Sequence, residues 1–153
     1  MADADRPTLG ALMSVTCFHF LRAGAEESAG RALIVTAGRE RGQDIVKSLG
    51  LEGKVQSADE IQKNLAKVLG IDGTRLCLVQ KIVAKDNGGF EVHITEGACT
   101  AGVTNAPEPH CAFTMGVFIG SIAHFTGKRM TGKETMCSGM GAAECVYQID
   151  PLD

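Results

Sequence analysis

The sequence is poor in aromatic residues and has no long hydrophobic run. Tryptophan is absent, tyrosine occurs once and phenylalanine six times in 153 residues. No apolar stretch approaches the roughly 20 residues that a membrane-crossing helix needs. The opening residues Met-Ala-Asp-Ala-Asp are acidic where a secretory signal would be basic. We therefore expect a cytoplasmic protein without a membrane span.

Positive charge is not concentrated anywhere along the chain. The 15 lysines and arginines are mixed with 18 acidic residues, for a net charge of −3. This argues against a nucleic-acid partner, which would require a basic patch or stripe. A Gly-x-Gly-x-x-Gly fingerprint in a βαβ setting is also missing, so a nicotinamide-dependent enzyme is not indicated. Composition and length are those of one globular domain.

The first half of the chain has helical periodicity. Residues 11–51 predict two helices separated at Gly30. The apolar stripes predicted to face the core come from two sets of residues. They are Leu12, Val15, Phe18, Leu21 and Ala25, followed by Leu33, Ala37, Ile45 and Leu49. Ser57 and Glu60 have capping-box spacing for a third helix, with Ile61, Leu65, Val68 and Leu69 on its buried face.

The second half predicts a sheet. Residues 76–84 and 90–95 alternate on either side of an Asp-Asn-Gly-Gly turn, which is typical of a hairpin. We predict a short strand at 110–115, a helix at 117–125 in which Gly116 and Gly120 allow close packing, and strands at 131–136 and 144–149. The fold class is therefore α+β, with N-terminal helices packed on a mainly antiparallel sheet that contains an inserted helix. Residues 1–10 are expected to be a flexible leader and residues 11–153 a single domain.

Four of the six cysteines are close together in the C-terminal third. Cys99, Cys111, Cys137 and Cys145 are expected to be reduced thiols, and Glu134 precedes Cys137 by three residues. A carboxylate and thiols around a tight turn can serve as ligands of a tetrahedral Zn²⁺. Buried cysteines are nevertheless common core residues, and redox chemistry is a third interpretation. Spacing alone leaves these three open.

The same region resembles a known family. The resemblance rests on His110-Cys111-Ala-Phe113, Gly132-Lys-Glu134-Thr-Met-Cys137 and Gly141-Ala-Ala-Glu-Cys145-Val-Tyr-Gln-Ile149. These segments resemble the 4-vinyl reductase, or hydrocarbon-binding, domain, and the chain looks like a short stand-alone member. The resemblance implies a dimeric ligand-binding fold related to Golgi-transport modules. It also implies a structural zinc on Cys111, Glu134, Cys137 and Cys145, with Cys99 as the alternative to Glu134.

The expected function is binding of a small hydrophobic or aromatic molecule, including a tetrapyrrole or chlorophyll precursor. Its pocket is predicted to be lined by Phe18, Phe113, Met115, Phe118, Ile122 and Phe125, all of which are equally plausible as core residues. Among the histidines, His110 is the best candidate for a metal ligand or for a hydrogen-bond donor to one. Two alternatives stay open: a reductase or accessory subunit acting on a vinyl-bearing chlorophyll precursor, and a photosystem assembly scaffold with a protein partner.

Overall fold

The computed structural model describes residues 6–152. Residues 1–5 of the predicted leader lie outside this range, and residues 6–10 are exposed and form a turn closed by the Gly10 N–H on the Arg6 carbonyl. The elements in chain order are α1 (Val15–Ala29), α2 (Arg31–Ser48), α3 (Ala58–Leu69), β1 (Leu78–Ala84), β2 (Phe90–Thr95), α4 (Ala112–Thr126), β3 (Met130–Met136), the 3₁₀ turn η1 (Ser138–Met140) and β4 (Cys145–Pro151). The predicted α+β class is confirmed.

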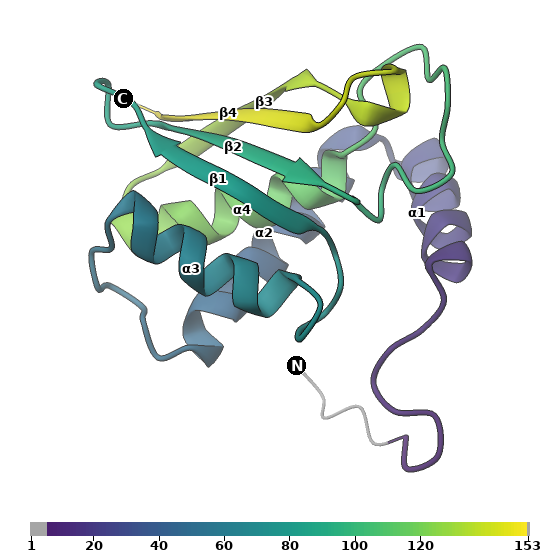
Figure 1. Cartoon of the computed structure of the whole chain (residues 1–153), viewed down its shortest axis with the longest axis horizontal. Helices are drawn as coiled ribbons and strands as arrows, with labels where there is room; N and C mark the ends of the chain where they lie inside the picture. Colours follow the sequence, from purple (N-terminus) through teal and green to yellow (C-terminus); the bar gives the residue numbers. More distant parts are fainter. Residues whose placement is uncertain (1–5, 153) are drawn as a thin grey trace.

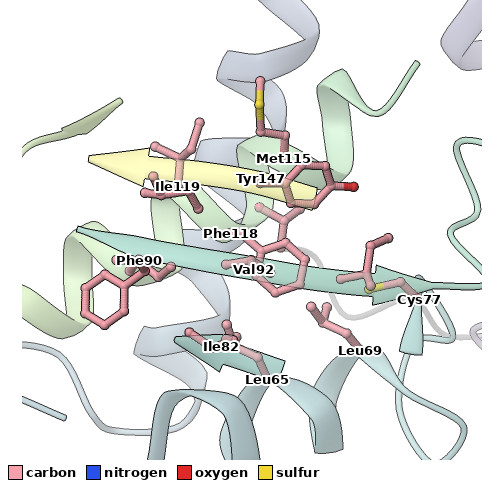
Figure 2. Packing of buried hydrophobic residues seen from close by; sticks show 14 of the residues in the cluster. Leu65, Leu69, Cys77, Ile82, Phe90, Val92, Met115, Phe118, Ile119 and Tyr147 are labelled. Atoms are coloured by element: carbon pink, nitrogen blue, oxygen red, sulfur yellow. The ribbon is translucent and has the colours of Figure 1, made fainter. Parts of the chain in front are cut away.

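The four strands form one antiparallel sheet in the order β1-β2-β4-β3. Helices α3 and α4 cover one face of this sheet, and α2 packs behind α4 (Figure 1). Figure 2 shows Leu65 and Leu69 of α3, Val92 and Tyr147 of the sheet and Phe118 of α4 filling the space between the layers. The core therefore lies between the sheet and α3 and α4.

Local sequence signals account for α3 and for the first hairpin. The Ser57 hydroxyl accepts from the Glu60 N–H, and the Glu60 carboxylate accepts from the Ser57 N–H, as the capping box predicts. Ile61, Leu65 and Leu69 are buried. Strands β1 and β2 pair from Leu78 with Thr95 to Ala84 with Phe90, so the predicted hairpin is confirmed.

The prediction for residues 110–125 was wrong. We expected a strand followed by a short helix, and the structure has a single helix, α4, of 15 residues. Eleven of these residues are buried, because α4 lies between the sheet and α2. A helix buried on all sides has no polar face, so its sequence lacks the 3.6-residue alternation that identifies an amphipathic helix.

The predicted buried faces of α1 and the first half of α2 were also wrong. Leu21 and Leu33 are 68% and 56% exposed, and the buried face of α2 is made by Ile34, Gly38 and Gly42. Arg22 is the one buried residue of α1. This helix lies at the edge of the molecule (Figure 1), where polar contacts rather than an apolar stripe hold it.

Candidate metal centre

Four side chains from separate elements meet at the end of the sheet nearest α1. Cys111 is the residue that caps the N-terminus of α4, and Glu134 lies on β3. Cys137 directly follows β3, and Cys145 begins β4. Strands β3 and β4 pair antiparallel, so the turn through η1 returns the chain from Cys137 to Cys145. A register shift between Glu134 and Met136 adds the local twist of a β-bulge next to this cluster.

The cluster is compact and buried. One ligand atom each from Cys111, Glu134, Cys137 and Cys145 lies within 4.8 Å of all the others, and all four residues are buried. The sulfurs of Cys111 and Cys145 are 3.5 Å apart. Ligands at 2.3 Å from a tetrahedral zinc would be about 3.8 Å apart. Cys111, Glu134, Cys137 and Cys145 could therefore hold a metal ion.

The carboxylate of Glu134 has one oxygen with hydrogen-bond partners and one without. Its Oε2 accepts from the Cys111 N–H at 3.0 Å and from the Arg31 guanidinium at 3.5 Å. Its Oε1 is buried and has no hydrogen-bond partner within residues 6–152. A buried carboxylate oxygen without a partner is costly. A cation among the three sulfurs would satisfy it, so the residues present fit a metal.

The acid–base properties of the thiols agree with a ligand role. Cys111 donates to the Cys145 sulfur, and this hydrogen bond, together with those from the Ser138 N–H and O–H at 3.2 and 3.3 Å, lowers the pKa of Cys145 to about 6. The donating role raises the pKa of Cys111, and burial raises that of Cys137. Without a cation, negative charge therefore concentrates on Cys145, and a divalent ion would favour the thiolate at all three positions.

A polar network joins the cluster to α1 and to the start of α2. Arg31 donates to the Pro109 carbonyl at 2.6 Å and contacts the carboxylates of Glu26 and Glu134, each at 3.5 Å. Arg22 contacts Glu26 at 2.6 Å and donates to Nε2 of His110 at 2.8 Å. Burial and the nearby Arg22 charge lower the pKa of His110, which agrees with a neutral ring accepting this bond. The histidine before Cys111 thus anchors α1 next to the cluster.

The C-terminal part of the chain matches a known family model over the residues that contain this cluster. Residues 90–151 match the vinyl-4-reductase domain. The family resemblance predicted from the sequence is thereby confirmed for this stretch, which we call the vinyl-reductase segment. No curated protein sequence matches the chain.

Solved structures share the fold at low sequence identity. The phenol-responsive sensory domain of the transcription activator PoxR, determined with phenol, has a TM-score of 0.70 and 17% identity over 93% of this chain and 76% of its own. A vinyl-4-reductase family protein from Methanocaldococcus jannaschii has a TM-score of 0.62 and 13% identity over 95% of this chain and 85% of its own. Trafficking protein particle complex subunit 3 from Naegleria fowleri, covalently bound to palmitic acid, has a TM-score of 0.58 and 11% identity over 91% and 93%. These likenesses establish the fold.

The alternative metal ligand, Cys99, lies beside the cluster rather than within it. Its sulfur is 3.1 Å from the Thr114 hydroxyl, and a hydrogen bond from Cys111 lowers its pKa to about 7. The group of four mutually close ligand atoms contains Glu134 and does not contain Cys99. In the vinyl-reductase segment the geometry therefore favours the carboxylate as the fourth ligand.

The six predicted pocket residues divide into core and boundary positions. Phe118, Ile122 and Phe125 are fully buried in the core, and Met115 is nearly so. Phe18 of α1 and Phe113 of α4 are half-buried, and their rings meet edge to face at 5.7 Å. The two hollows described for residues 6–152 have none of the six in their walls. Whether these side chains surround a ligand stays a prediction.

Sequence reasoning missed Arg22, Glu26 and Arg31. Arg31 contacts Glu134 across 103 positions in the sequence, and Arg22 contacts His110 across 88. No local pattern marks such contacts. The one available signal is an arginine within the predicted apolar stripe of the first helix, one position after Leu21.

Proposed function

We propose that this protein binds a small hydrophobic or aromatic molecule between α1 and α4, beside a structural zinc ion. Two buried nitrogen atoms carry the proposal. Nε2 of His19 and Nε of Arg22 are buried and have no hydrogen-bond partner within the described part of the chain. Both belong to α1, where Phe18 meets Phe113. Aromatic rings beside unpaired polar atoms are what a site for a small aromatic ligand with one polar group requires.

The proposed metal role is structural. Three thiolates and a carboxylate are ligands that zinc accepts, and sulfur favours zinc over magnesium or calcium. Four protein ligands would leave no open coordination position for a substrate. When bound, the ion would supply positive charge that holds β3, β4 and the start of α4 together. Arg31 and the Cys111 N–H hold Oε2 of Glu134 and leave Oε1 directed to the ion.

The loose attachment of α1 supports a ligand entering beneath this helix. Arg22 is the one buried residue of α1, and Phe20 is 79% exposed. A segment with few buried apolar contacts can separate locally from the rest of the fold at low free-energy cost. Comparison proteins with this fold are described with phenol and with palmitic acid, which agrees with an apolar ligand. We include a tetrapyrrole among the candidates.

Replacing Arg22 with glutamine should weaken a polar aromatic ligand more than an apolar one. We expect phenol to bind the zinc-loaded protein, and its dissociation constant to rise about tenfold or more in Arg22→Gln, since a hydrogen bond to a charged group contributes about 1.5–3 kcal/mol. Toluene, which has no acceptor, should bind both forms equally. Calorimetric titration measures both probes, and Arg41→Gln on α2 is the matched control. Equal weakening of phenol and toluene, or no binding of either to the unchanged protein, contradicts the proposed site.

The predicted homodimer is best placed on the exposed apolar side chains near α1. Leu12, Met13, Phe20 and Leu21 are each at least half exposed, and a group of exposed apolar residues is typical of an interaction surface. We expect light scattering to give twice the 16.1 kDa chain mass, and Phe20→Asp to give a monomer. Ile71→Asp, at an equally exposed apolar residue elsewhere, should leave the dimer intact. A monomeric unchanged protein contradicts this placement.

None of the helices in residues 6–152 combines the length and the apolar character needed to cross a membrane.

A further inference from the structure

A second hollow lies at the opposite end of α4 from the cysteine cluster. Its volume is about 510 Å³, and its walls come from α2, the α2–α3 connector, the C-terminal end of α4 and the start of β3. In Figure 1 these parts gather on the left, and α1 is on the right. The 15 residues of α4 rise about 22 Å, so the hollow is well separated from the metal cluster. It falls within the usual volume range of small-molecule sites.

The hollow is positive in a protein that is negative overall. Arg39, Lys128 and Arg129 line it together with one carboxylate, Glu52, whereas the whole chain has a net charge of −3. Within residues 6–152, none of these three cations forms an ion pair. Three cations from two distant parts of the sequence thus converge without a protein anion to neutralise them.

A purely structural role explains only part of this arrangement. Gly127 ends α4 with a φ of 67°, and cations after a helix C-terminus stabilise its dipole. That accounts for Lys128 and Arg129. Arg39 belongs to α2, and its carbonyl lies so close to Gly120 that a Cβ there would be 2.1 Å away. The contact between the two helices therefore brings a further cation, from another element, to the same place.

The remaining walls are apolar or offer one more ring nitrogen. Ala123, Met130 and Leu152 contribute hydrocarbon surface. Nδ1 of His124 lies 3.0 Å from the Gly120 carbonyl, which can only accept, so Nδ1 donates and Nε2 is left for a ligand or solvent. The site therefore combines an apolar wall with a cationic rim.

We infer that this hollow binds a small organic anion, a carboxylate or phosphate attached to an apolar body. The charged group contacts Arg39, Lys128 and Arg129, and the apolar body lies against Met130 and Leu152. Because the hollow is open to solvent, the attraction is screened by salt. Binding here is independent of the metal cluster and of the proposed ligand beneath α1.

The test is a titration of the full-length, metal-replete protein with octanoate, followed through its backbone amide NMR signals. We expect octanoate to shift the amides of Ala123, Gly127 and Met130, and added salt to weaken the effect. The double variant Lys128→Gln/Arg129→Gln should raise the dissociation constant about tenfold or more. The matched control is Lys81→Gln/Lys133→Gln, which removes the same charge from exposed strand positions and should bind as the unchanged protein does.

Two further probes separate the contributions of charge and apolar body. Neutral 1-octanol and inorganic phosphate should each bind these amides at least tenfold more weakly than octanoate. Octanol binding as tightly as octanoate would overturn the role of the cations, and phosphate binding as tightly would overturn the role of the apolar wall. Equal octanoate affinity in the two double variants, or no shift of these amides at millimolar octanoate, would overturn the site.

Discussion

Replacing Cys137 with serine is expected to remove the bound metal and to destabilise the protein by about 4 kcal/mol, if free metal is near 1,000 times its dissociation constant. Cys137 is buried within the group of four ligand atoms. A hydroxyl is a far weaker zinc ligand than a thiolate, and the three ligands that remain hold the ion less tightly. Elemental analysis of untagged protein should give about one zinc per chain before the substitution and little after it. Chemical denaturation measures the stability change.

The control must separate metal loss from the effect of putting a hydroxyl into the core. Cys77→Ser makes the same chemical change at a buried thiol outside the cluster, where burial raises the pKa to about 12. It should lower stability and leave the metal content unchanged. With a strong chelator present, the extra loss in Cys137→Ser should disappear. Full metal content in Cys137→Ser would show that the cluster is a set of core thiols.

The sequence allows the metal cluster to be predicted more completely than its surroundings. The spacing of Glu134, Cys137 and Cys145 places all three on one β-hairpin, where few alternative geometries exist. Cys111 required the family resemblance, because its position depends on how α4 packs. The ligand set is consistent with the geometry, and metal binding itself stays a prediction.

The network around the cluster depends on tertiary contacts that leave no periodic trace. Arg22 faces inward because His110 and Glu26 accept its hydrogen bonds, and Leu21 then faces outward. A rule that places apolar residues inside therefore chooses the wrong face of α1. Conversely, the capping box at Ser57 and the hairpin around Gly88 were predictable because their hydrogen bonds connect near neighbours.

The contact between α2 and α4 was foreseen from glycine spacing on α4 alone. Gly116 and Gly120 were expected to allow close packing, and the structure confirms this and adds Gly38 and Gly42 on α2. A Cβ at Gly38 would lie 2.2 Å from the Phe113 carbonyl oxygen, and one at Gly42 the same distance from that of Val117. Each glycine costs a helix about 1 kcal/mol relative to alanine. Four of them are tolerated because the backbones touch.

Replacing Gly120 with alanine is therefore expected to destabilise the protein by about 3 kcal/mol or more, although alanine is the better helix former. The new Cβ would lie 2.1 Å from the Arg39 carbonyl oxygen and 2.8 Å from two further Arg39 backbone atoms. No side-chain rotation relieves a backbone contact, so α2 and α4 must separate, which also opens the core beneath them. Chemical denaturation at neutral pH measures the change.

The same substitution on α1 should have the opposite sign. A Cβ at Gly24 would meet nothing within 4 Å, so Gly24→Ala gains helix propensity without a clash and should stabilise the protein by up to about 1 kcal/mol, less if α1 already separates from the fold. Opposite signs for the two variants would identify close backbone packing as the reason for the α4 glycine. A Gly120→Ala protein as stable as the unchanged one would contradict the direct contact between α2 and α4 on which the positions of Cys111 and Arg39 both depend.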